Sequence, residues 1–152
     1  MKKAGFSEPV SIMRYDIQDL KRLVRDGHTV AASDGERLLT SCERGIKPLV
    51  QWLDDGLCLA GFSVADKIVG RAAAMLYVRL GAARVWAQVM SRGGKTVLAE
   101  HGIAAESEVE TERIINRLGT GMCPMEEAVK GVDDPLEAER ALKAKLKQLR
   151  GA

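Results

Sequence analysis

Two short segments of this chain combine side chains that could do chemistry. Asp66 and Lys67 place an acid beside a base in an apolar stretch, where the pair could transfer a proton or hold an anionic substrate. Further along, Ser91-Arg92-Gly93-Gly94-Lys95 combines two cations with two glycines. Such a segment binds anions when it begins a helix, because the first backbone N–H groups of a helix are free. Both segments therefore predict a site for a negatively charged ligand.

A third segment adds a thiol. Pro124 suits the first position of a helix, which makes Cys123 the residue before it, and a thiol at that end of a helix is a better nucleophile. Glu126 could act there as a base or as a cap. Asn116 and Arg117 come shortly before a glycine-rich turn and could bind a carboxylate, a phosphate or a carbonyl. The catalytic candidates are thus Asp66, Lys67 and Cys123, and the others are ligand-binding candidates.

Each candidate also has a structural interpretation that the sequence leaves open. Ser63 and Asp66 have the spacing of a capping box, so Asp66 could serve the helix rather than a ligand. Ser91 could cap an ordinary glycine turn, Cys123 could be a buried structural residue, and Arg117 could pair with a surface acid. A full phosphate-binding loop is not expected, because Val89 stands where that motif requires a glycine.

The hydrophobic pattern predicts the elements that position these residues. Glycines and prolines divide the chain, and Asp34-Gly35 indicates a hairpin between two strands. Residues 64–80, apolar around most of their circumference, are predicted to form the central helix, with Asp66 and Lys67 in its first turn. The other predicted helices are 16–25, 45–55, 94–101, a short element at 112–117, one beginning at 124, and a charged C-terminal helix at 135–150. The predicted strands are 29–32, 37–41, 57–62, 84–90 and 103–106.

Alternating strands and helices predict an α/β fold, a three-layer α-β-α sandwich with a mixed sheet of about five strands. In such a sheet, ligands bind at the carboxyl ends of the parallel strands. Asp66 and Lys67 are therefore expected at the same edge as Ser91 to Lys95. If the loop 116–123 folds over that edge, all three segments converge on one polar pocket.

Three stretches of sequence resemble a known family. The sequence of residues 65–73, together with Ile115-Asn116-Arg117 and residues 121–126, is similar to that of an uncharacterised prokaryotic domain of unknown function. That family is placed in the cytidine-deaminase-like superfamily, and the resemblance covers roughly residues 12–142. It implies the fold that the element order predicts.

The resemblance also shows where this chain departs from the zinc deaminases. Those enzymes begin the central helix with His-x-Glu or Cys-x-Glu and carry Pro-Cys-x-x-Cys after the next strand. Here the corresponding places hold Ala65-Asp66-Lys67 and residues 91–95. Because catalytic zinc needs three protein ligands in a tight cluster, we expect no zinc site, no other cofactor and no zinc-dependent deamination.

The bulk properties narrow the remaining possibilities. The chain has 152 residues, 46% of them hydrophobic, and is expected to form one domain over 1–152, with a loose leader at 1–13. A net charge of +2 and an aromatic content of 4% argue against nucleic acid as a partner. No apolar run is long enough to span a membrane, and three cysteines without a Cys-x-x-Cys motif favour the cytoplasm.

The sequence predicts a protein that binds a small anionic or nucleotide-like ligand at the strand edge. The alternative is a metal-independent enzyme that uses Asp66, Lys67 and Cys123. The sequence leaves open the ligand, whether a reaction is catalysed, and whether copies of the chain associate.

Overall fold

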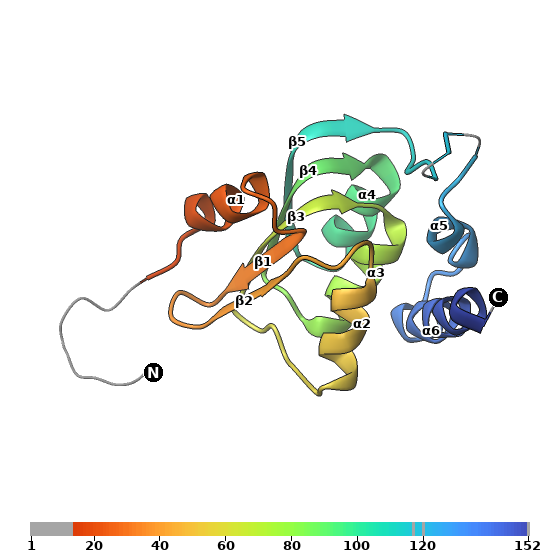
Figure 1. Ribbon diagram of the computed structural model, residues 1–152, viewed down its shortest axis with the longest axis horizontal. Helices are drawn as coiled ribbons and strands as arrows, with labels where there is room; N and C mark the ends of the chain where they lie inside the picture. The colour runs from red at the N-terminus through yellow and green to blue at the C-terminus, as the bar shows by residue number, and fades with distance from the viewer. Residues whose placement is uncertain (1–13, 117, 120, 152) are drawn as a thin grey trace.

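A mixed sheet of five strands organises the protein, and its order is β2-β1-β3-β4-β5 (Figure 1). The computed structural model describes residues 14–116, 118–119 and 121–151, so the predicted leader at 1–13 and Arg117 lie outside the described residues. β1 pairs antiparallel with β2 and with β3, whereas β3, β4 and β5 run parallel. The bounds of the strands are β1 Val30–Ser33, β2 Leu38–Ser41, β3 Ser63–Val69, β4 Arg84–Ser91 and β5 Ala104–Thr111.

Helices cover both faces of the sheet, as predicted for a three-layer sandwich (Figure 1). α1 packs on β1 and β3 on one face, over a small core around Leu20 and Trp86. α3 and α4 lie on the other face, over the main core, and α6 packs on the outer side of α3. The bounds of the helices are α1 Ile17–Arg25, α2 Lys47–Asp54, α3 Arg71–Leu80, α4 Arg92–Glu100, α5 Pro124–Ala128 and α6 Pro135–Gly151.

The prediction for residues 57–80 was wrong in one important respect. Residues 64–69, assigned to the central helix, belong to β3, and 57–62 form no strand. A parallel strand that is buried on both faces has no alternating pattern, so periodicity cannot distinguish it from a buried helix. α3 begins after Gly70, whose backbone is extended, and ends at Gly81, which adopts the left-handed φ of 82°.

Two other features bear on the site. α4 begins where Ser91 accepts a hydrogen bond from the backbone of Gly94 at 3.0 Å, which is the capping role that the sequence left open for Ser91. β5 is longer than predicted and continues to Thr111. Of the two alternatives for residues 112–117, a short helix or an irregular turn, the part of that segment that the structure describes forms no helix. The parallel strands therefore deliver Gly70, Ser91 and Thr111 to one edge of the sheet.

Candidate functional site

The carboxyl ends of β3, β4 and β5 meet α5 around a pocket of about 400 Å³. Each strand end contributes to its wall, and the segment from Met122 to Asp133 closes it from the outside. Basic and acidic side chains alternate in this wall. The residues that line it are Arg71, Ser91, Gly93, Glu112, Arg113, Met122, Glu126, Lys130, Gly131 and Asp133.

Glu126 joins α5 to the start of α3. The backbone N–H groups of Arg71 and Ala72 each donate to one oxygen of its carboxylate, both at 2.8 Å. These donors are the first free N–H groups of α3, and the positive end of the helix dipole favours the negative charge. Glu126 therefore caps the start of α3, whereas the sequence had suggested it as a cap of its own helix, α5, which has no side-chain capping bond.

Arg71 fastens the same segment from the opposite side. Its guanidinium donates to the carbonyl oxygens of Val129 and Val132 and to the carboxylate of Asp133, the last at 2.9 Å. Glu126 and Arg71 thus form reciprocal contacts between α3 and the chain that follows α5. Polar contacts at both ends hold the outer wall of the pocket in place.

Close approach of two backbones brings the starts of α3 and α4 together. A Cβ atom at Gly94 would lie 2.9 Å from the carbonyl carbon and oxygen of Gly70, and 3.1 Å from the oxygen of Val69. A Cβ atom at Gly70 would meet the Glu126 carboxylate at 2.5 Å. Glycine at both positions is therefore what allows the two helix N-termini and Glu126 to share one edge of the sheet.

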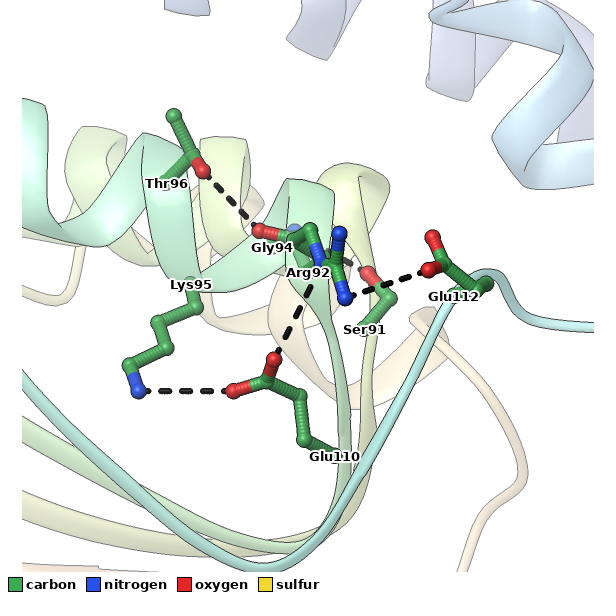
Figure 2. Close-up of polar contacts among 7 residues, drawn as sticks. All are labelled: Ser91, Arg92, Gly94, Lys95, Thr96, Glu110 and Glu112. Carbon is green, nitrogen blue, oxygen red and sulfur yellow. Dashed lines mark hydrogen bonds and ion pairs between the residues drawn. The ribbon is translucent and has the colours of Figure 1, made fainter.

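The predicted anion-binding cations of α4 are occupied by acids of β5 and the residue after it. Figure 2 shows Lys95 with the Glu110 carboxylate at 3.3 Å, and Arg92 with the Glu112 carboxylate at 3.1 Å and Glu110 at 3.8 Å. All four side chains are substantially exposed, so each pair contributes little to stability. Their charges nevertheless compensate one another, and neither cation is left for a ligand alone.

Two other cations of the pocket remain available. Within the part of the chain that the structure describes, the side chains of Arg113 and Lys130 form no ion pair. Arg113 follows β5, and Lys130 follows α5. Sequence reasoning missed both residues and also Arg71. A later start of the central helix, after Gly70, would have drawn attention to Arg71, but no local pattern marks the other two.

The residues predicted as catalytic lie elsewhere. Asp66 is in β3, only 8% exposed, and its carboxylate accepts a hydrogen bond from the Tyr77 hydroxyl of α3 at 2.5 Å. Burial raises the pKa of Asp66 to about 7, although Tyr77 and the backbone of Ile68 act to lower it. The predicted capping box with Ser63 was wrong, because both residues belong to a strand.

Lys67 and Cys123, like Asp66, lie outside the lining of the pocket. Lys67 is exposed in β3, and its backbone N–H donates to Thr29 at 3.0 Å. Cys123 precedes α5, as predicted, is partly buried as a free thiol, and makes no side-chain capping bond. None of the three residues lines the pocket. Of the predicted ligand-binding residues, Ser91, Gly93 and Glu126 do, and Asn116 lies in the adjoining loop, where its backbone N–H donates to Gly121.

The described residues contain neither a metal-binding cluster nor a membrane-spanning helix. Among the residues that are described, no three His, Cys, Asp or Glu side chains are grouped so that they could hold a metal ion. Over the same described ranges, no helix has the length and apolar character needed to cross a membrane.

Comparison with known proteins places this architecture in a family. A family model described as "Domain of unknown function (DUF1893)" matches residues 18–146. The chain belongs to the DUF1893 family. A solved structure of a DUF1893 family protein from Thermotoga maritima is similar over 93% of this chain and 99% of its own, with 25% identity and a TM-score of 0.76. No curated protein matches the chain. The DUF1893 match includes every strand that the structure describes and all the residues that line the pocket.

One prediction concerns the contact that closes the pocket in this DUF1893 protein. Glu126→Ala removes both acceptors from the first turn of α3, so we expect the free energy of unfolding to fall by about 1–2 kcal/mol. Urea denaturation measures this change. Glu127→Ala is the matched control, because Glu127 is an exposed acid on the same helix. Equal losses in the two variants would contradict the capping role.

Proposed function

We propose that this protein binds a small anionic ligand, such as a phosphorylated or nucleotide-like metabolite, in the pocket between the strand ends and α5. The observation that carries the proposal is the presence of Arg113 and Lys130 in its wall, because the described residues offer neither of them an ionic partner. Two uncompensated cations attract a ligand with about two negative charges. A volume of about 400 Å³ suits a small metabolite.

A second hollow, of about 480 Å³, supports the choice by contrast. It opens between α1 and β5, and its lining includes Trp86, the cations Lys21 and Lys95, and three glutamates, Glu106, Glu108 and Glu110. An anion there would meet three carboxylates on one strand. The pocket at the strand ends also contains three carboxylates, but each of them has a partner. Asp133 pairs with Arg71, and Glu112 pairs with Arg92. Glu126 accepts from two backbone N–H groups at the start of α3. Arg113 and Lys130, which form no ion pair with the described residues, therefore lie at the edge where parallel sheets bind ligands.

The proposal also covers the structural superfamily of the protein and its cellular compartment. The mixed sheet, with α3 and α4 on one face, supports membership of the cytidine-deaminase-like superfamily, with a single domain over 1–152. Free thiols at Cys42, Cys58 and Cys123 support a reducing compartment, the cytoplasm. A metal-independent enzyme remains the competing proposal. The observation that favours it is the pKa of Asp66 near 7, which suits proton transfer at neutral pH.

Isothermal titration of the protein with inorganic phosphate, pyrophosphate and nucleoside monophosphates tests the binding proposal. We expect saturable binding of at least one anion and a loss of about tenfold or more in affinity for Arg113→Ala and for Lys130→Ala, since each substitution removes a charged partner worth about 1.5–3 kcal/mol. Lys145→Ala, on α6, is the control for the loss of a surface charge. No binding to any of these anions, or equal weakening by all three variants, would contradict it. Turnover of a bound nucleotide would favour the enzyme.

A further inference from the structure

The sheet face that carries α1 has an exposed apolar row near the carboxyl ends of the parallel strands. The row consists of Ile68, Val89 and Val109, which are aligned in register across β3, β4 and β5. Ile68 is 51% exposed and Val109 is 54% exposed, while Val89 is partly buried. Large apolar side chains that lie together on a surface commonly mark an interaction site.

In these strands, the regular alternation of side chains between the two faces of the sheet is interrupted. As a result, the apolar row does not face the main core. Asp66 contacts α3, and Val69, three residues later, is buried in the same core. In β5, Glu108 contacts α1, whereas Glu110 contacts α4 on the opposite face. In a regular strand, Asp66 and Val69 would lie on opposite faces of the sheet, and Glu108 and Glu110 would lie on the same face. The apolar row therefore lies on the face of the sheet that carries α1, outside the main core.

The described helices leave this row uncovered. α1 packs on β1 and β3 and ends at Arg25. Arg25 and Lys21 extend over Trp86 of β4, with a guanidinium carbon or ammonium nitrogen about 5 Å from the ring centre. Ile68 and Val109 remain about half exposed in spite of these two side chains. Parallel strands normally have both faces covered, so an additional layer is expected here.

The charges beside the apolar row indicate which partner fits. Lys67, Gln88 and Glu108 precede its three members, so the three neighbouring strands present a positive, a neutral and a negative side chain. Consider a second copy, placed face to face about a two-fold axis parallel to β4. This rotation sets β3 opposite β5, so Lys67 meets Glu108 of the partner subunit while the apolar rows meet each other. The face is therefore complementary to itself in charge and in hydrophobicity.

We propose that the face formed by the apolar row and its flanking charges is the interface of a homodimer. Glu108 already pairs with Arg25 at 2.7 Å, and both side chains are about half exposed. A second cation at such a carboxylate has precedent in this chain, because Glu139 holds both Arg79 and Lys143. The proposal is independent of ligand binding at the pocket.

Sedimentation equilibrium with charge-reversed variants tests the interface. In a homodimer of the Lys67→Glu variant, two glutamates face each other at each end of the interface. In a homodimer of the Glu108→Lys variant, two lysines face each other at the same places. We expect each variant alone to dissociate on the order of tenfold more readily than the wild type. An equimolar mixture restores an opposite charge at both ends, so it should form heterodimers with near wild-type affinity. Circular dichroism of each variant checks that its fold is retained.

Replacement of an apolar residue by a charged one provides the second arm of the test. Val109→Asp should give a monomer, whereas Leu149→Asp on α6, where the leucine is 48% exposed, should leave the dimer intact. A wild-type protein that is monomeric at its highest soluble concentration would overturn the proposal. So would a dimer that persists in Val109→Asp, or a mixture of the two charge variants that stays monomeric.

Discussion

Replacement of Asp66 by asparagine is expected to make the protein more stable above neutral pH and to change how its stability depends on pH. The folded-state pKa of Asp66 is raised from 3.8 to about 7, chiefly because its carboxyl group is buried. Between these values the native protein keeps a proton that the unfolded chain releases. The contribution of Asp66 to the free energy of unfolding therefore falls as pH rises from 4 to 7.

The size of the effect follows from the shift. About three pKa units correspond to on the order of 4 kcal/mol, present in full only above pH 7. Asparagine does not titrate, and its amide oxygen can still accept from the Tyr77 hydroxyl. Urea denaturation of both proteins from pH 4 to 8 should show that the advantage of Asp66→Asn grows across this window. Tyr77→Phe should extend the fall to higher pH, because it removes a donor that lowers the pKa of Asp66. A constant difference would contradict this account of Asp66.

Replacement of Gly94 by alanine is expected to destabilise the protein by about 3 kcal/mol, within the range seen when a methyl group is forced into a packed interior. The added Cβ atom would lie 2.9 Å from the backbone of Gly70, which has no flexible end that could yield. The starts of α3 and α4 would have to separate, and both line or adjoin the pocket.

Gly93→Ala is the matched control for this effect. A Cβ atom there would meet only the hydroxyl oxygen of Ser91, at an ordinary contact distance of 4.0 Å. Because alanine favours helix more than glycine does, we expect a gain of about 1 kcal/mol. Thermal unfolding of the two variants distinguishes a steric cause from a general intolerance of this turn. Similar losses at both positions would show that the approach of Gly94 to Gly70 is not the cause.

The sequence predicted those parts of the molecule that depend on near neighbours. The cap at Ser91, the hairpin around Gly35 and the five-stranded mixed sheet follow from turn residues and from the spacing of apolar side chains. The boundary between β3 and α3 was missed because buried residues lie on both sides of it, at 64–66 in the strand and at 72–74 in the helix. As a result, Asp66 was placed in the first turn of a helix, when it is in fact a buried strand residue that bonds to Tyr77.

The site depended more on contacts between distant segments. Glu126 caps a helix that begins 55 residues earlier in the chain, and Arg92 and Lys95 are compensated by Glu110 and Glu112. Pairings of this kind are determined by the fold, and they cannot be predicted from residue type or from spacing along the sequence. The sequence did predict the edge at which the pocket lies, because that edge follows from the parallel order of the strands.

The most direct test of the central claim is an NMR titration of the full chain with inorganic pyrophosphate and with adenosine monophosphate. The account predicts saturable shifts of backbone amides centred on Gly93, Arg113 and Lys130, and their loss in the Arg113→Ala, Lys130→Ala double variant. Shifts centred instead on Lys21 and Glu108 at the other hollow, or no saturable shift with either anion, would contradict it.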